Sequence, residues 1–222
     1  GAHVAEAAVV PRDGSWESSH RNWVSPLQES WLRHGKLPVS DFPAGRPVVA
    51  QPLELSSPTV TVLGFLPYWN FGTAVIRLDR ITVLSYFGAA LAADATLSDL
   101  NDWGSDPMDE LIQAAHAAGV KVVLTVVNFN SEDLEALLSD PGRRDVAVGA
   151  LAQAVADAGA DGINVDFEGL PLEVKSGFVD FVANLKAAIS VVAPDGGHVT
   201  VDTPVVDWTG AYDYDALAAA CD

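Results

Sequence analysis

Sulfur-containing residues are scarce in this 222-residue chain, which has one cysteine and one methionine. A single cysteine excludes an intrachain disulfide, so the fold depends on its hydrophobic core. The five histidines show no spacing typical of metal ligands, and we expect no metal or other cofactor. No run of about 18 apolar residues occurs, which argues against a membrane-spanning helix.

Basic residues are also few, with 12 Lys/Arg against 30 Asp/Glu and a formal net charge of −18. Residues 59–222 carry most of the imbalance, with seven basic and 24 acidic side chains. Such a domain repels nucleic acid and anionic membrane surfaces, whereas an uncharged glycan tolerates the charge. The composition therefore excludes a nucleic-acid partner more firmly than it identifies another one.

Residues 1–58 differ in composition from the rest of the chain. They hold three of the six tryptophans, and five prolines lie between residues 38 and 58. Trp23 and Trp31 have helical spacing, which favours a short amphipathic piece packed on the domain over an aromatic strip that stacks on sugars. Proline-rich segments are typical of extended linkers. We therefore divide the chain into an N-terminal arm with linker, 1–58, and a folded domain, 59–222.

The domain alternates apolar strand patterns with amphipathic helix patterns. Strands are predicted at 59–66, 81–87, 121–127, 162–167 and 199–205. Helices are predicted at 107–118, 132–138, 144–158, 173–192 and 214–220. Strands that alternate with helices indicate an α/β fold with a parallel sheet and right-handed crossovers.

The fourth predicted strand carries the chemistry. From Asp161 to Glu168 the chain reads Asp-Gly-Ile-Asn-Val-Asp-Phe-Glu. Side chains alternate along a strand, so Asn164, Asp166 and Glu168 share one face. The neighbouring strands are almost wholly apolar, which indicates a sheet covered by helices and an enclosed acidic face. Carboxylates crowded together raise one another's pKa, and a carboxyl that keeps its proton can serve as a general acid.

An alternative interpretation is a turn followed by an edge strand with a solvated polar face. Either interpretation allows Asp161-Gly162 to serve in part as a turn, because glycine accepts positive φ without steric cost.

The segment closely resembles the catalytic strand of glycoside hydrolase family 18, the chitinase family, whose pattern is Asp-Gly-x-Asp-x-Asp-x-Glu. Asp161, Gly162, Asp166 and Glu168 match that pattern. Asn164 departs from it, as in the chitobiase-like and spore-cortex-lytic branches. The resemblance implies a (β/α)8 TIM barrel with this motif on its fourth strand, where chemistry gathers at the C-terminal strand ends.

The resemblance also implies roles for the three polar residues. Glu168 would be the acid and base, Asp166 would hold the substrate acetamide, and Asn164 would replace a third carboxylate. The substrate would be a glycan with β-linked N-acetylglucosamine, as in chitin or peptidoglycan, cleaved without a protein nucleophile. Such a protein would act outside the cell or in its envelope.

Further substrate-binding candidates lie beside the motif and at other strand ends, because aromatic rings stack on sugar faces. These candidates are Asp161, Tyr68, Trp69, Tyr86, Asn128 and Trp208. Plain core packing is an alternative for Tyr86 and Phe87.

Eight strands are implied by the resemblance and five are predicted, so we expect a barrel truncated after about five strands. Its open edges would then self-associate or lie under the N-terminal arm. Two other functions remain open: a non-catalytic glycan-binding module, or inactive fragment of a longer enzyme, and an unrelated α/β enzyme with a fortuitous motif.

Overall fold

A parallel sheet forms the centre of the computed structural model, which describes residues 48–49 and 60–222. The predicted arm and linker therefore lie almost entirely outside the described residues. Five parallel strands lie side by side in chain order: β2 (Leu63–Pro67), β4 (Val83–Leu91), β6 (Lys121–Asn128), β7 (Gly162–Phe167) and β8 (His198–Val201).

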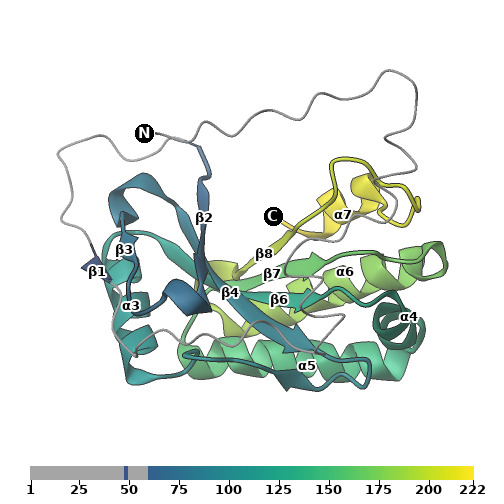
Figure 1. Ribbon diagram of the computed structural model, residues 1–222, viewed down its shortest axis with the longest axis horizontal. Helices are drawn as coiled ribbons and strands as arrows, with labels where there is room; N and C mark the ends of the chain where they lie inside the picture. The colour runs from purple at the N-terminus through teal and green to yellow at the C-terminus, as the bar shows by residue number, and fades with distance from the viewer. Residues whose placement is uncertain (1–47, 50–59) are drawn as a thin grey trace, which may run out of the picture.

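Helices connect β4 to β6, β6 to β7 and β7 to β8, and one more follows β8 (Figure 1). They are α3 (Asp106–Ala117), α4 (Ser131–Ser139), α5 (Pro141–Ala158), α6 (Lys175–Val192) and α7 (Tyr214–Ala220). Local sequence sets their ends: the Asn130 side chain accepts hydrogen bonds from the first turn of α4, and Asp140 does the same for α5. Gly159 ends α5 in the left-handed region at φ 62°.

Short elements complete the domain. β1 (Val48–Val49) pairs with β3 (Val75–Ile76) in a separate sheet, and β5 (Leu97–Ser98) pairs antiparallel with β4. Single 3-10 turns are η1 (Tyr68–Asn70), η2 (Leu78–Arg80), η3 (Leu172–Val174) and η4 (Pro194–Gly196).

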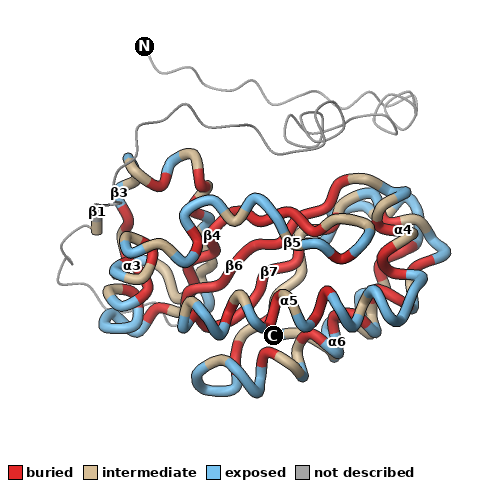
Figure 2. The backbone as a smooth tube through the Cα atoms, turned by 90° about the horizontal axis from the view of Figure 1, so that it is seen from below, coloured by how far each residue is buried: buried red, intermediate tan, exposed pale blue. Residues whose placement is uncertain are grey.

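The sheet has two distinct faces, and β7 shows why. Ile163, Val165 and Phe167 are fully buried on the face covered by helices. The Phe167 ring lies 5.9 Å from the ring of Phe178 and 5.6 Å from that of Phe181, both on α6. Figure 2 shows buried backbone along β4, β6 and β7 and exposed residues along the helices. The predicted alternation of β7 is therefore confirmed.

The opposite face, here called the inner face, is polar at its centre. Thr125, Asn164 and Thr200 are paired across β6, β7 and β8, so their side chains lie on the same side. The Ser85 and Thr125 hydroxyl oxygens are 2.7 Å apart on this face. β2 and β8 stand at the two ends of the sheet and do not pair, so the described strands leave it open.

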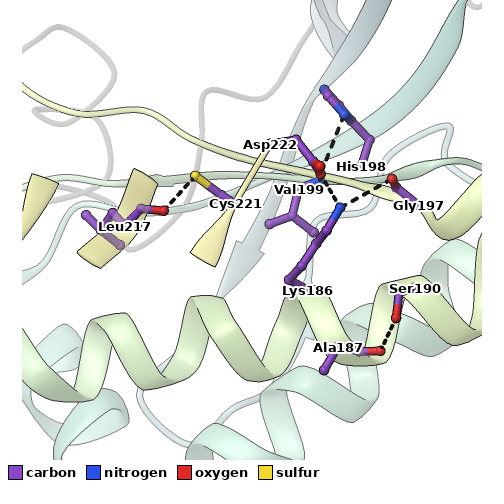
Figure 3. Close-up of polar contacts among 9 residues, drawn as sticks. All are labelled: Lys186, Ala187, Ser190, Gly197, His198, Val199, Leu217, Cys221 and Asp222. Carbon is purple, nitrogen blue, oxygen red and sulfur yellow. Dashed lines mark hydrogen bonds and ion pairs between the residues drawn. The ribbon is translucent and has the colours of Figure 1, made fainter. Parts of the chain in front are cut away.

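Asp222 covers part of the β8 edge (Figure 3). Its backbone N–H donates to the Val199 carbonyl and its Oδ2 accepts from the Val199 N–H, both at 2.8 Å, while Lys186 pairs with the same carboxylate. Asp161 repeats this pair of bonds two strands earlier, with Val122 of β6 at 2.8 and 2.6 Å. At both β6 and β8, an aspartate therefore bonds to one strand residue through its backbone N–H and its carboxylate.

Self-association through the open edges of the sheet stays a prediction.

The last strand is shorter than predicted. It ends at Val201 rather than at residue 205, although the Asp202 N–H still donates to Val165 at 2.8 Å. Pro204 has no N–H to continue the ladder, and Val205 is fully exposed.

Gly162 does not have the turn role predicted for it. It is the first residue of β7, and positive φ is found at other glycines but not here. A Cβ at this position would overlap the carbonyl oxygen of His198. The glycine is therefore needed for the close approach of β7 and β8.

We predict that Gly162→Ala destabilises the fold by roughly 3 kcal/mol, because the two strands must separate to admit the methyl group. The matched control is Gly149→Ala on the exposed side of α5, where a Cβ meets nothing within 4 Å. That change should be neutral or stabilise by up to about 1 kcal/mol. Thermal unfolding of both variants measures the difference, and equal melting temperatures would contradict the close-approach explanation.

Candidate active site

The buried amide of Asn164 lies at the centre of the inner face and is fully shielded from solvent. Its Nδ2 donates to Asp202 Oδ2 at 2.8 Å, and its Oδ1 accepts from the Thr200 hydroxyl at 2.6 Å. Both ends of the amide are thus satisfied by β8 or the residue that follows it. A buried polar side chain with all these bonds made ties the two strands together at a defined register.

Asp166 and Glu168 follow on the same face toward the C-terminal end of β7. Burial, with the nearby charges of Asp202 and Glu168, raises the pKa of Asp166 to about 8. Burial and the charge of Asp202 also raise the pKa of Glu168. Crowded, half-buried carboxyls of this kind share protons and titrate as a group. This arrangement can hold a proton at neutral pH and deliver it to a bound substrate.

Asp202 is a member of this cluster that sequence reasoning missed. Burial raises the pKa of its carboxyl, while the hydrogen bond from Asn164 opposes the rise. The sequence does carry a signal for Asp202, because Thr200 and Asp202 are two residues apart, as Asn164 and Asp166 are. Using that signal requires the register between β7 and β8, which places Asn164 beside Thr200.

Tyr212 is a second residue that sequence reasoning missed. Its hydroxyl donates to the Phe167 carbonyl oxygen at 2.6 Å and so fixes the backbone just before Glu168. Burial raises the pKa of Tyr212, and the carboxylates of Glu168 and Asp166 raise it further. The contact joins residues 45 apart with no periodic pattern, so no sequence signal reveals it.

Aromatic rings occupy the inner face near β2 and β4. Phe87 lies edge-on to Phe65 and Trp69, with ring centroids 6.5 and 5.9 Å apart. Phe65 is paired with Ser85, which places it on the inner face, and it is 50% exposed. Tyr68 is buried beside Trp69, and burial with the charge of Asp99 raises its pKa to about 12. Of the predicted aromatic candidates, Trp69, which is partly buried, is the one that joins this group of rings.

Three predicted site residues lie away from the acidic cluster. Asp161 is at the opposite end of β7, where its carboxylate accepts from the Val122 N–H and pairs with His116 at 2.8 Å. Asn128 is fully buried on the helix-covered face, and its Nδ2 donates to Leu91 at 2.7 Å. Both side chains therefore hold backbone in place and do not reach the inner face.

Tyr86 also points away from the inner face. It is fully buried, stacks on Trp103 at 5.9 Å, and its hydroxyl accepts from the Asp102 N–H at 3.1 Å. The structure supports the core-packing interpretation for this residue. Trp208 is 48% exposed in the loop after β8. Asp207 shapes this loop by accepting hydrogen bonds from the N–H groups of Gly210 and Tyr212.

Across residues 48–49 and 60–222, no group of three or more His, Cys, Asp or Glu side chains is arranged to hold a metal ion. Within the same residues, no helix combines the length and apolarity needed to cross a membrane.

No protein-family model matches the chain, and no curated protein matches it significantly. Solved structures do match. The catalytic domain 2 of a Group II chitinase from Ostrinia furnacalis matches with a TM-score of 0.62 at 20% identity, over 73% of this chain and 48% of that chain. The spore cortex-lytic enzyme SleL of Bacillus cereus matches with a TM-score of 0.57 at 18% identity, over 81% of this chain and 42% of that one.

A chitinase from Bacteroides thetaiotaomicron matches with a TM-score of 0.55 at 16% identity, over 77% of this chain and 52% of that chain. The chain thus spans about half the length of these solved structures. At such identities the likeness shows the fold. This chain has the α/β fold of the chitinase-type TIM barrel, with the barrel unclosed over the described residues.

The raised pKa of Asp166 predicts how stability depends on pH. The folded protein keeps this proton up to about pH 8, whereas the unfolded chain loses it near about pH 4. The folded state therefore binds more protons in that window, and stability falls as pH rises through it. Asp166→Asn removes the charge, so its stability relative to the wild type should increase steadily from pH 4 to pH 8.

Chemical denaturation at several pH values measures this difference. Asp145→Asn, on the exposed side of α5, is the matched control and should follow the wild-type curve. Parallel curves for the wild type and Asp166→Asn would show that Asp166 titrates normally.

Proposed function

We propose that this chain carries the catalytic strand of a glycoside hydrolase that cleaves glycans containing β-linked N-acetylglucosamine, of the chitin or peptidoglycan type. The observation that carries the proposal is the coupled pair Asp166 and Glu168, both with raised pKa, on the inner face of β7. A general acid near its working pH is what glycosidic cleavage requires.

Glu168 protonates the glycosidic oxygen as the bond breaks. The carbonyl oxygen of the substrate's own 2-acetamido group attacks the anomeric carbon, and the leaving sugar departs with the proton. Water then attacks the intermediate while the Glu168 carboxylate takes its proton, which restores the acid. The configuration at the anomeric carbon is retained, because two displacements occur in sequence.

Asp166 accepts a hydrogen bond from the acetamide N–H and stabilises the positive charge that develops on the ring formed by that group. A bound acetamide favours the ionised form of Asp166, because a hydrogen bond to a carboxylate favours its charged state. The proton shared by the coupled carboxyls then resides on Glu168, where the reaction needs it. Substrate binding therefore positions the nucleophilic acetamide and leaves Glu168 protonated.

Several features support this substrate class. The half-exposed ring of Phe65 and the partly buried ring of Trp69 offer flat apolar surfaces on the inner face, of the kind that stack on sugars. The net charge of −18 disfavours densely charged anionic polymers such as nucleic acid. The matched structures include two chitinases and a spore cortex-lytic enzyme, which supports the same class of chemistry. Because chitin and peptidoglycan lie outside the cytoplasm, we place the site of action outside the cell or in its envelope.

Replacing Glu168 tests the assignment of the acid. In the full-length protein, Glu168→Gln should lower kcat on N-acetylglucosamine oligomers by about 10²–10⁴-fold, because the amide keeps the shape and loses the transferable proton. Oligomer affinity, measured by calorimetry, should change little. Glu173→Gln, at an exposed position in η3, is the control and should keep full turnover. Wild-type turnover in Glu168→Gln would remove Glu168 from the mechanism.

Deacetylated substrates test the nucleophile. Oligomers with a free amine at every 2-position should not be cleaved, and a thiazoline analogue of the cyclic intermediate should inhibit, because it mimics what the site stabilises. Product analysis by mass spectrometry gives both answers. Equal rates on acetylated and fully deacetylated oligomers would point to a nucleophile supplied by the protein.

A further inference from the structure

The orientation of the Asn164 amide is dictated by Asp202. A carboxylate can only accept hydrogen bonds, so the nitrogen of the amide must face it, as observed at 2.8 Å. The oxygen then turns to the Thr200 hydroxyl, which donates at 2.6 Å. Both the nitrogen and the oxygen of the Asn164 amide therefore have a defined hydrogen-bond partner.

An acidic residue at position 164 would not fit this arrangement. Its carboxylate would face that of Asp202 in a fully buried position, where two negative charges repel strongly and one of the two groups would have to take up a proton. Asn164 and Asp202 are therefore complementary: the amide on β7 is the partner that a carboxylate beside β8 requires.

Asp202 also lies next to Asp166 on the inner face. The last registered pair is Val165 with Val201, and the Asp202 N–H continues the ladder by donating to Val165 at 2.8 Å. The next residues on the two strands are Asp166 and Asp202. The titratable groups that raise the pKa of Asp166 are Asp202 beside β8 and Glu168 just after β7, and the charge of Asp166 in turn raises the pKa of Tyr212 in the loop before α7.

We propose that Asp202 is a third carboxylate of the site, held by Asn164 beside the neighbouring strand, and that it acts on the reaction through Asp166 by its charge. This inference rests on the proposed function for its catalytic consequence. Asp202 contributes the negative charge that keeps a proton on the Asp166–Glu168 pair. Asn164 holds that charge at a fixed place without adding one of its own.

Four chains test the proposal: the wild type, Asp202→Asn, Asn164→Asp, and the exchange variant that carries both changes. Asp202→Asn keeps the shape but removes the charge. The exchange variant restores one carboxylate and one amide with their strands swapped. Thr200→Val is the control, because it removes the other hydrogen bond of Asn164 and leaves every charge in place.

Carbon-13 NMR titration of the Asp and Glu carboxyls in the free protein gives the first readout. The titration midpoint of Asp166 should fall by about one pH unit in Asp202→Asn, because a neighbouring negative charge is lost. In the exchange variant, the midpoint of Asp166 should return most of the way to its wild-type value. Thr200→Val should lower the melting temperature without moving this midpoint.

The pH profile of glycan cleavage by the full-length protein gives the second readout. In Asp202→Asn the alkaline limb of kcat should move to lower pH by a similar amount while KM changes little, and the exchange should rescue it. A merely structural tie between strands would lower stability in Asp202→Asn and Thr200→Val alike and leave both the NMR midpoint and the alkaline limb unchanged. That result would overturn the proposal.

The two readouts separate this inference from the proposed function. If the wild type cleaves no glycan but the Asp166 midpoint still shifts in Asp202→Asn, the charge role of Asp202 stands and the proposed function fails. If the wild type is active and the midpoint of Asp166 is the same in all four chains, the proposed function stands and the role of Asp202 fails.

Discussion

The buried amide of Asn164 is the contact on which the acidic face depends. It joins β7 to β8 through Thr200 and Asp202, and it does so without adding charge where three carboxyls already lie close together. Hydrogen bonds to a charged group in a shielded site are stronger than those in water, so the register of the two strands is well specified. Gly162 allows the same two strands to approach at their other ends. The positions of Asp166 and Glu168 follow from these two constraints.

Much of the fold could be predicted from sequence because it follows from short-range patterns. The bounds predicted for β7 and α7 match those observed, and the other long helices differ by a few residues at their ends. Three strands were less well predicted: β2 begins later, β4 begins later and continues to Leu91, and β8 ends earlier. A strand ends where its neighbour stops offering hydrogen bonds, and periodicity carries no information about that neighbour.

The residues of the candidate site likewise fall into those that could be predicted from sequence and those that could not. Asn164, Asp166 and Glu168 could be predicted because alternation within one strand places them together. Asp202 and Tyr212 reach the cluster from elsewhere in the chain, through register and a long-range hydrogen bond. Tyr86 lies in a strand that is almost wholly apolar and buried throughout, so its pattern could not tell the inner face from the helix-covered one. Asn128 was predicted from its position at a strand end alone. That position does not distinguish a substrate-binding side chain from one whose amide holds a loop.

The account rests on one physical claim, that the inner face of β7 holds a proton on a buried carboxyl at neutral pH. Infrared difference spectroscopy tests this most directly, because a protonated carboxyl has a carbonyl stretch that a carboxylate lacks. The account predicts such a band in the wild type at pH 7, lost or much reduced when Asp166 is replaced by Asn. A wild-type spectrum at pH 7 with only ionised carboxylates would contradict it.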